Sequence, residues 1–157
     1  MARFAPVRPY VCAGAGFLLA VVWFDLMHDV QVLRASADTD ARNSVLSIAR
    51  YYRRVTTDAR PMNRLVALVM VATLAAILAE IVTGDVPPWM AWTSLACALA
   101  PISLAARRTV RNAVALGADV DELTVAHQAL ARSIGRDHVF CLCSIAALLA
   151  VQLAGAG

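Results

Sequence analysis

Four long apolar runs divide the chain, and they constrain its fold more than any other feature. They cover about residues 9–33, 61–82, 87–106 and 138–153. Three of them are near the ~20 residues that a helix needs to cross a bilayer, and the polar stretch before the fourth predicts an earlier helix start. Hydrophobic residues make up 61% of the chain, whereas a soluble domain is nearer to half apolar. We therefore predict one all-α membrane domain over residues 1–157, a four-transmembrane-helix bundle.

The two long connections between the runs are themselves predicted to be helical. The first, about residues 40–58, contains "NSVLSIARYYRRV", in which apolar side chains and Tyr51 or Tyr52 fall on one helical face. The second, about residues 121–137, is amphipathic and leads directly into the fourth run. We therefore expect the connections to extend the bundle as helices.

The distribution of arginine predicts the orientation in the membrane. All 14 basic residues are Arg, and 12 of them lie in or beside the two long connections. The positive-inside rule then places these connections in the cytoplasm and both termini outside, in the plasma (inner) membrane. The arginines that give the net charge of +3 lie between the apolar runs, so this charge reflects membrane topology and nucleic-acid binding is not expected.

A signal peptide ending at Ala35-Ser36-Ala37 is the alternative for the first run, but charged residues before that site disfavour cleavage.

Three ionisable residues, Asp25, His28 and Asp29, lie at the end of the first apolar run, in "VVWFDLMHDVQVL". On a helix they fall within about 100° of one another. Two carboxylates one turn apart repel, and an ionisable residue inside a span costs a few kcal/mol, so a compensating cation, arginine or shared proton is expected. The alternative is that these residues already lie in the solvated interface.

The predicted topology brings polar residues from all four spans to one mouth of the bundle. Convergent polar groups beside an apolar pocket are the usual mark of a ligand site. The candidate catalytic residues are Asp25, His28, Asp29 and His138. The candidate substrate-binding residues are Tyr51, Asn63, Asn112 and Arg136.

A metal site is an alternative use of the same residues. His28, Asp29 and His138 offer two imidazoles and a carboxylate, a set that suits iron or zinc. A haem held by two histidines from the first and fourth spans is a second alternative.

The four cysteines form no C-x-x-C pair, so they are predicted to be buried, unpaired thiols. No nucleotide, esterase or zincin motif occurs in the sequence.

The chain resembles the anthrone oxygenase-like family of small four-span membrane proteins. The resemblance covers "AGAGFLLAVVWFD", "YYRRVTTDARPMNRL", "TVRNAVAL" and "SIGRDHVFCLCSIAALL". Where members carry a Pro-Leu-Asn segment after the third span, this chain keeps Asn112 without the proline. Where members carry Arg-Trp-x-x-x-His before the last span, this chain has Arg132 or Arg136 and His138 without the tryptophan.

The resemblance implies a membrane oxygenase that oxidises a polycyclic phenol or anthrone-type substrate with O₂, with no cofactor required. It implies that His28 or His138 acts as general base, oriented by Asp25 or Asp29. The residues that would stabilise the enolate are Tyr51, Asn112 and Arg136. The expected partners are the lipid bilayer and a lipophilic small molecule, and a homo-oligomer is compatible with the sequence.

A non-catalytic alternative is an accessory subunit of a larger membrane complex. In that case Asp25 or Asp29 is expected to form an internal ion pair, and the candidate partners are Arg64, Arg111 and Arg136.

Overall fold

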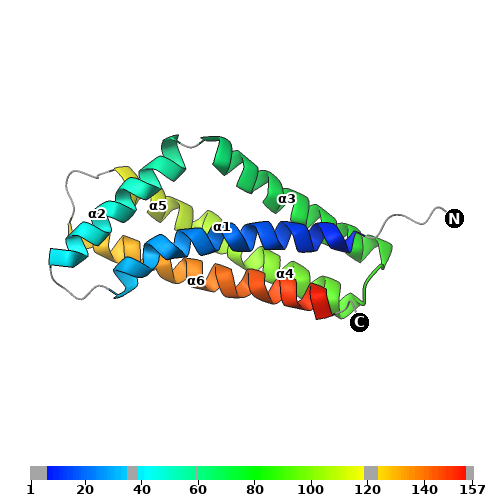
Figure 1. Ribbon diagram of the computed structural model, residues 1–157. Coiled ribbons are helices and arrows are strands. Elements are labelled where there is room, and N and C mark those ends of the chain that lie inside the picture. The colour runs from blue at the N-terminus through cyan, green and yellow to red at the C-terminus, as the bar shows by residue number, and fades with distance from the viewer. Residues whose placement is uncertain (1–6, 35–38, 59, 119–123, 155–157) are drawn as a thin grey trace.

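The fold is all-α in the residues that the structure, a computed structural model, describes, which are 7–34, 39–58, 60–118 and 124–154, and only short turns there are not helical. No strand occurs in these ranges. In chain order the elements are α1 (Arg8–Arg34), α2 (Thr39–Arg53), the π-helical turn η1 (Arg54–Asp58), α3 (Arg60–Thr83), α4 (Pro88–Leu104), the π-helical turn η2 (Ala105–Thr109), α5 (Val110–Ala118) and α6 (Val125–Ala154) (Figure 1).

Four helical segments are long and apolar enough to cross a membrane, which confirms the predicted all-α membrane bundle. They are Arg8–Leu33, Pro61–Thr83, Pro88–Ala118 and Val125–Ala154. The third is longer than its apolar run because α4 continues through η2 into α5. The fourth is longer because α6 includes most of the predicted amphipathic stretch as one helix.

Prolines and one glycine set the helix boundaries between the second and third spans. Gly84 ends α3 with a φ of +68°, a conformation that costs glycine little. Pro88 then opens α4 at the first helical position, where a missing N–H costs nothing. Pro101 lies inside α4 and leaves the carbonyl of Cys97 without its usual helical donor. Ser144 of α6 donates to that carbonyl at 2.9 Å, so a neighbouring helix satisfies it.

Small residues allow the helices to approach closely where the site is built. A Cβ added to Gly135 of α6 would lie 3.1 Å from Leu33 and 3.3 Å from Cβ of Asp29, both on α1. A Cβ added to Gly117 of α5 would lie 2.9 Å from the backbone nitrogen of Arg53. These two contacts bring α1 against α6 and α2 against α5.

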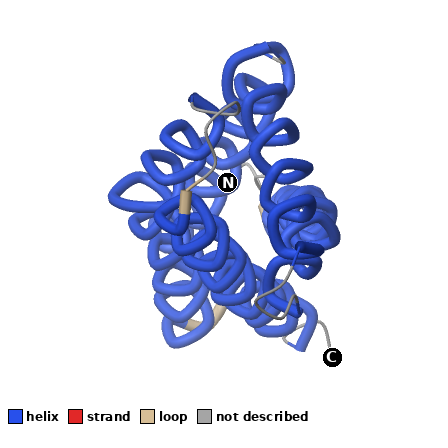
Figure 2. The backbone as a smooth tube through the Cα atoms, turned by 90° about the vertical axis from the view of Figure 1, so that its left-hand side faces the viewer, coloured by secondary structure: helices blue, strands red, loops and turns tan. Residues whose placement is uncertain are grey.

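The two largest apolar cores of the described residues lie at opposite ends of the bundle. One joins α2 to α1, α5 and α6, and its buried members are Val32, Val45, Ile48, Ala49, Tyr52, Ala113, Leu116, Ala131 and Ile134. The other joins α1, α3, α4 and α6, and its buried members are Val11, Ala15, Ala76, Ile77, Ala98, Ile145 and Leu148. Between them α3 diverges from α1 toward its N-terminal end, as Figure 1 shows. Figure 2 shows the helices arranged around the long axis of the bundle.

Candidate functional site

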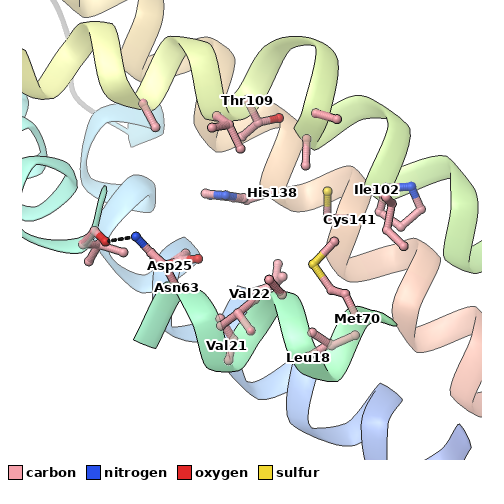
Figure 3. Close-up of a pocket in the computed structure, with 18 of the residues that line it drawn as sticks. Leu18, Val21, Val22, Asp25, Asn63, Met70, Ile102, Thr109, His138 and Cys141 are labelled. Atoms are coloured by element: carbon pink, nitrogen blue, oxygen red, sulfur yellow. Dashed lines mark hydrogen bonds between the residues drawn. The ribbon is translucent and has the colours of Figure 1, made fainter. Parts of the chain in front are cut away.

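A cavity of about 840 Å³ lies between the two cores. Its walls are mainly apolar side chains from every span, such as Val21 of α1, Met70 of α3 and Ile102 of α4 (Figure 3). Its polar lining includes Asp25, Tyr51, Tyr52, Asn63, Thr109 and His138. A cavity of this size with a few polar groups on an apolar wall is typical of a small-molecule site.

The cavity opens between the start of α3 and α5. Met62, Val110 and Val114 line it and are themselves 51%, 54% and 51% exposed. All three lie inside candidate membrane spans, and all three are apolar. Exposed apolar side chains therefore border the opening, and it suits a lipophilic molecule better than a hydrated one.

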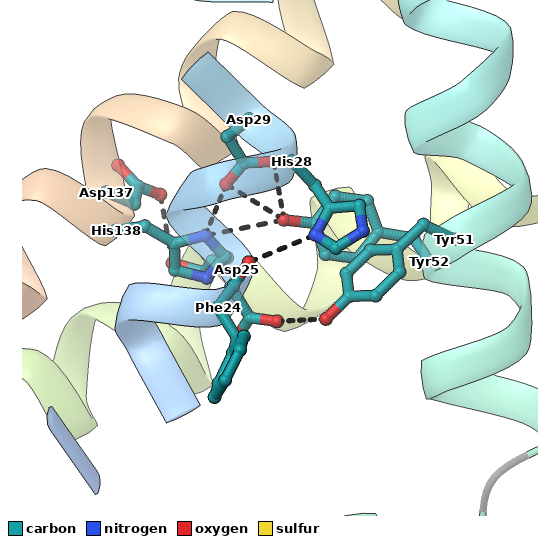
Figure 4. A network of polar contacts seen from close by, with 9 residues as sticks. Phe24, Asp25, His28, Asp29, Tyr51, Tyr52, Asp137 and His138 are labelled. Carbon is teal, nitrogen blue, oxygen red and sulfur yellow. Dashed lines mark hydrogen bonds and ion pairs between the residues drawn. The ribbon is translucent and has the colours of Figure 1, made fainter. Parts of the chain in front are cut away.

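The polar end of the cavity is built around Asp29, Tyr52 and His138, which come from α1, α2 and α6 (Figure 4). Asp29 is fully buried. Its Oδ2 lies 2.6 Å from Nδ1 of His138, and its Oδ1 accepts from the hydroxyl of Tyr52 at 2.8 Å. The same hydroxyl oxygen lies 3.3 Å from Nδ1 of His138. Two donors from two other helices thus offset the burial of this carboxylate.

The contact with Asp29 decides which nitrogen of His138 carries the hydrogen. Because a carboxylate only accepts, Nδ1 must be the donor. In the neutral ring, Nε2 then keeps a lone pair, and it has no hydrogen-bond partner in the described part of the chain. His138 lines the cavity and lies near Asp25, Thr109 and Cys141 in Figure 3. An imidazole held this way is arranged as a general base.

A second polar pair lies one helical turn along α1. The hydroxyl of Tyr51 donates to Oδ1 of Asp25 at 2.5 Å, and both residues line the cavity. The ring of His28 stacks on Tyr51 with centroids 4.1 Å apart, and its Nδ1 lies 3.0 Å from the carbonyl oxygen of Phe24. Asp25 and Asp29 therefore each accept a hydrogen bond from a tyrosine of α2, a compensation other than the cation, arginine or shared proton that was expected.

Both tyrosines lie outside the candidate spans and keep their hydroxyl protons. Burial, followed by the charge of Asp25, raises the pKa of Tyr51 above its ordinary value. Burial, followed by the charge of Asp29, raises the pKa of Tyr52 still further. Each phenol therefore remains a donor to its carboxylate at neutral pH.

The two π-helical turns both border the cavity. Val55 and Thr56 of η1 and Ala105 and Thr109 of η2 are among its lining residues. Such turns interrupt the regular helical bonding and are frequent at functional sites. Asn63 also lines the cavity, and its amide nitrogen donates to the carbonyl of Val55 at 2.6 Å. This bond fixes the start of α3 to η1.

An arginine–aspartate pair fixes η2 to α6 beside His138. Asp137 is buried and accepts from Arg108 and, at 2.9 Å, from the hydroxyl of Thr109. The accessory-subunit alternative expected an arginine beside Asp25 or Asp29. In the described residues the partners of Asp29 are Tyr52 and His138, and the arginine pair forms at Asp137.

The structure brings together only part of the predicted site. Asp25, Tyr51, Asn63 and His138 line the cavity, and Asp29 lies directly behind His138. The other three candidates, His28, Asn112 and Arg136, do not line it. Asn112 lies 3.4 Å from the hydroxyl of Ser133, and Arg136 is exposed.

The predicted metal and haem sets are not assembled. His28 stacks on Tyr51, and a series of ring contacts through Tyr51 and Tyr52 separates it from His138. Among the described residues, no three His, Cys, Asp or Glu side chains form a group that could hold a metal ion.

Tyr52 and Asp137 are among the site residues that sequence reasoning missed. Tyr52 shares a face of α2 with Val45 and Ile48, since spacings of seven and four residues are close to whole turns, and all three are buried. That spacing was the available signal for choosing Tyr52 over Tyr51 as the buried tyrosine. Asp137 had no comparable signal, because its partner Arg108 lies on another span.

The chain matches no family model, no curated protein and no solved structure. The geometry of the cavity and its polar end is therefore the main support for a functional assignment.

Proposed function

We propose that this protein is an integral membrane oxidoreductase of the oxygenase type, which binds a flat lipophilic molecule in the cavity and deprotonates it with His138. The observation that carries the proposal is the arrangement of His138. Its Nδ1 is held by the buried Asp29, and its Nε2 has no partner in the described residues at the edge of an 840 Å³ apolar cavity. Asp29 orients the ring and stabilises the imidazolium that forms when Nε2 takes a proton.

The chemistry that fits is proton removal from an acidic C–H or phenol, followed by reaction with O₂. Nε2 of His138 takes the proton, and the carbanion left behind is electron-rich. Its electron pair forms a C–O bond to O₂, and the resulting peroxide takes up a proton. Loss of water from that hydroperoxide at a CH₂ carbon leaves a carbonyl, so one O₂ is consumed and one water is released. The resemblance to the anthrone oxygenase-like family favours a tricyclic anthrone-type substrate for this sequence.

The oxyanion that develops on the substrate needs a donor. Of the three residues predicted for this role, Tyr51 lines the cavity, whereas Asn112 and Arg136 do not. The hydroxyl of Tyr51 is therefore our candidate for this role, and its single O–H would turn from Asp25 to the oxyanion.

The cavity supports catalysis over an accessory role. An accessory subunit needs no internal space, whereas this bundle leaves a cavity of small-molecule size beside an oriented histidine. We place the cavity end at the cytoplasmic face of the inner membrane and both termini outside, because 12 of the 14 arginines lie in or beside the connections at that end.

The test is O₂ uptake and quinone formation by the full chain in lipid nanodiscs, with anthrone as the probe. We expect His138→Gln to lower turnover by about 10²–10⁴-fold, the usual contribution of a general base, while anthrone still binds. Met70→Trp should abolish both binding and turnover, because the indole would occupy the cavity next to Met70 (Figure 3).

Each matched control introduces the same new residue at a position away from the cavity. His127 lies 3.0 Å from the backbone nitrogen of Thr124 at the start of α6, so His127→Gln should keep full turnover. Leu68 is 65% exposed on another face of α3, so Leu68→Trp should keep binding. Wild-type protein that binds anthrone without consuming O₂ would contradict the oxygenase chemistry. Equal turnover in His138→Gln and wild type would contradict the role of His138.

A further inference from the structure

A second buried polar cluster lies at the end of the bundle opposite to the cavity's polar end. Glu80 of α3, Ser94 of α4 and Gln152 of α6 are each fully buried. The amide nitrogen of Gln152 donates to Oε2 of Glu80 at 2.9 Å and lies 3.0 Å from the hydroxyl oxygen of Ser94. All three residues lie inside candidate membrane spans, so the cluster ties three spans together within the apolar region.

Two acceptor oxygens in this cluster have no partner in the described part of the chain. They are Oε1 of Glu80 and Oε1 of Gln152. An ionised carboxylate only accepts, and an amide oxygen only accepts, so neither atom can satisfy the other. An unsatisfied buried polar atom costs about 1–3 kcal/mol, and an uncompensated charge in a span costs more.

The charged groups around Glu80 act on its carboxyl group in opposite directions. Arg8 of α1 donates a hydrogen bond to the backbone carbonyl of Gln152. Arg8 also attracts a carboxylate at Glu80, and Asp85, in the turn after α3, repels it more weakly. A hydrogen on Glu80 would remove the buried charge and create the donor that the cluster lacks.

We propose that Glu80 is a proton-binding site, occupied at neutral pH in the membrane-embedded protein. Its carboxylic O–H donates toward Oε1 of Gln152 while its other oxygen accepts from the amide nitrogen of Gln152. The cluster is then neutral, and one hydrogen bond, from Glu80 to Gln152, gives both of the unpartnered oxygens a partner. None of its three residues lines the cavity, so the site is separate from the proposed chemistry of His138.

The test is infrared difference spectroscopy between wild type and Glu80→Gln in lipid nanodiscs. The buffer is at neutral pH with a large organic ammonium ion as its sole cation. We expect the variant to lose the C=O stretching band of a protonated carboxylic acid, while its carboxylate bands stay the same as in wild type. Loss of a carboxylate band instead would overturn the proposal.

Sodium is the competing occupant, because the cluster's free acceptors are oxygens that also suit a small cation. The spectra are therefore repeated with sodium chloride. We expect the acid band to remain, whereas its conversion to a carboxylate band by sodium would overturn the proposal in favour of a cation site.

A second variant keeps Glu80 in place, in case Glu80→Gln does not fold. In Gln152→Leu the acid C=O loses the donor from Gln152, so its band should move to higher frequency. Gln31 is exposed on α1, and Gln31→Leu should leave the band unmoved. A shift confined to the carboxylate region in Gln152→Leu would also overturn the proposal.

Discussion

The two buried polar clusters of this bundle differ in how fully their acceptors are satisfied. At the cavity, both oxygens of Asp29 accept hydrogen bonds from α2 or α6. At the other end, Glu80 and Gln152 share one hydrogen bond, and each keeps an unpartnered oxygen in the described residues. The first arrangement suits an ionised carboxylate, and the second suits a protonated one.

The comparison shows that two equally buried carboxyl groups can differ in how many donors they receive. Asp29 and Glu80 are both 0% exposed. What separates them is the supply of donors, since Tyr52 and His138 both donate to Asp29, whereas within the described part of the chain only Gln152 donates a side-chain hydrogen bond to Glu80. Isosteric substitutions should therefore act differently at the two positions.

The largest difference is expected between Asp29→Asn and Glu80→Gln. An asparagine at position 29 would place an amide N–H against one of two existing donors, so the free energy of unfolding should fall by about 2–3 kcal/mol. A glutamine at position 80 resembles the protonated acid and brings a donor, so its cost should stay below about 1 kcal/mol. Unfolding in mixed micelles measures both. Equal losses would show that the two carboxyl groups carry the same charge.

The next difference is expected between the two tyrosines of α2. Tyr52 is 4% exposed and serves a fully buried carboxylate, so Tyr52→Phe should cost about 1–3 kcal/mol. Tyr51 is half-buried, and water can replace its hydroxyl, so Tyr51→Phe should cost about 1 kcal/mol or less. The same unfolding measurement compares them, and a larger loss at Tyr51 would contradict the order of burial.

Two glycine substitutions, one at a helix contact and one in open space, test how tightly α2 packs against α5. The Cβ of Gly117→Ala would meet the backbone of Arg53 at 2.9 Å, and a backbone cannot move aside without shifting α2. We expect a loss of about 1–2 kcal/mol. Gly16 has no atom within 4 Å of an added Cβ, so Gly16→Ala should be neutral or stabilising by up to about 1 kcal/mol. Unfolding of each variant beside wild type gives the two values.

The smallest effect is expected at alkaline pH. The pKa values of Tyr51 and Tyr52 are raised by burial and by the neighbouring carboxylates. Above about pH 10 the unfolded chain loses these protons while the folded chain keeps them, so stability falls as pH rises. Tyr52→Phe should make this fall shallower. Parallel curves for variant and wild type above about pH 10 would contradict the shift, and below about pH 9 the curves should be parallel.

The sequence predicted the spans well because apolar length is a local property. Residues 61–82 and the observed span Pro61–Thr83 agree almost to the residue. The continuation of α4 through η2 was harder to predict, because Pro101 normally weakens a helix and its effect is repaired by Ser144 from another span. Contacts of that kind depend on packing rather than on local pattern.

The sequence predicted that the polar ends of the spans lie close together, but it did not predict which side chains contact one another. Topology alone placed Asp29 and His138 at the same mouth, and the structure joins them at 2.6 Å. Which face of each helix turns inward depends on crossing angles and close contacts such as Gly135 against α1. Asn112 and Arg136 were predicted at the correct end of the bundle, but their side chains lie outside the cavity lining.

The apolar opening between α3 and α5 has a consequence for how the protein would meet its ligand. If the bilayer reaches Met62 and Val114, a molecule that enters between them would arrive from the lipid, without passing through water. Its encounter rate then depends on its mole fraction in the two-dimensional bilayer rather than on its concentration in the buffer. Adding inert lipid at fixed amounts of protein and ligand would dilute the ligand around the opening and slow binding, whereas adding buffer would not.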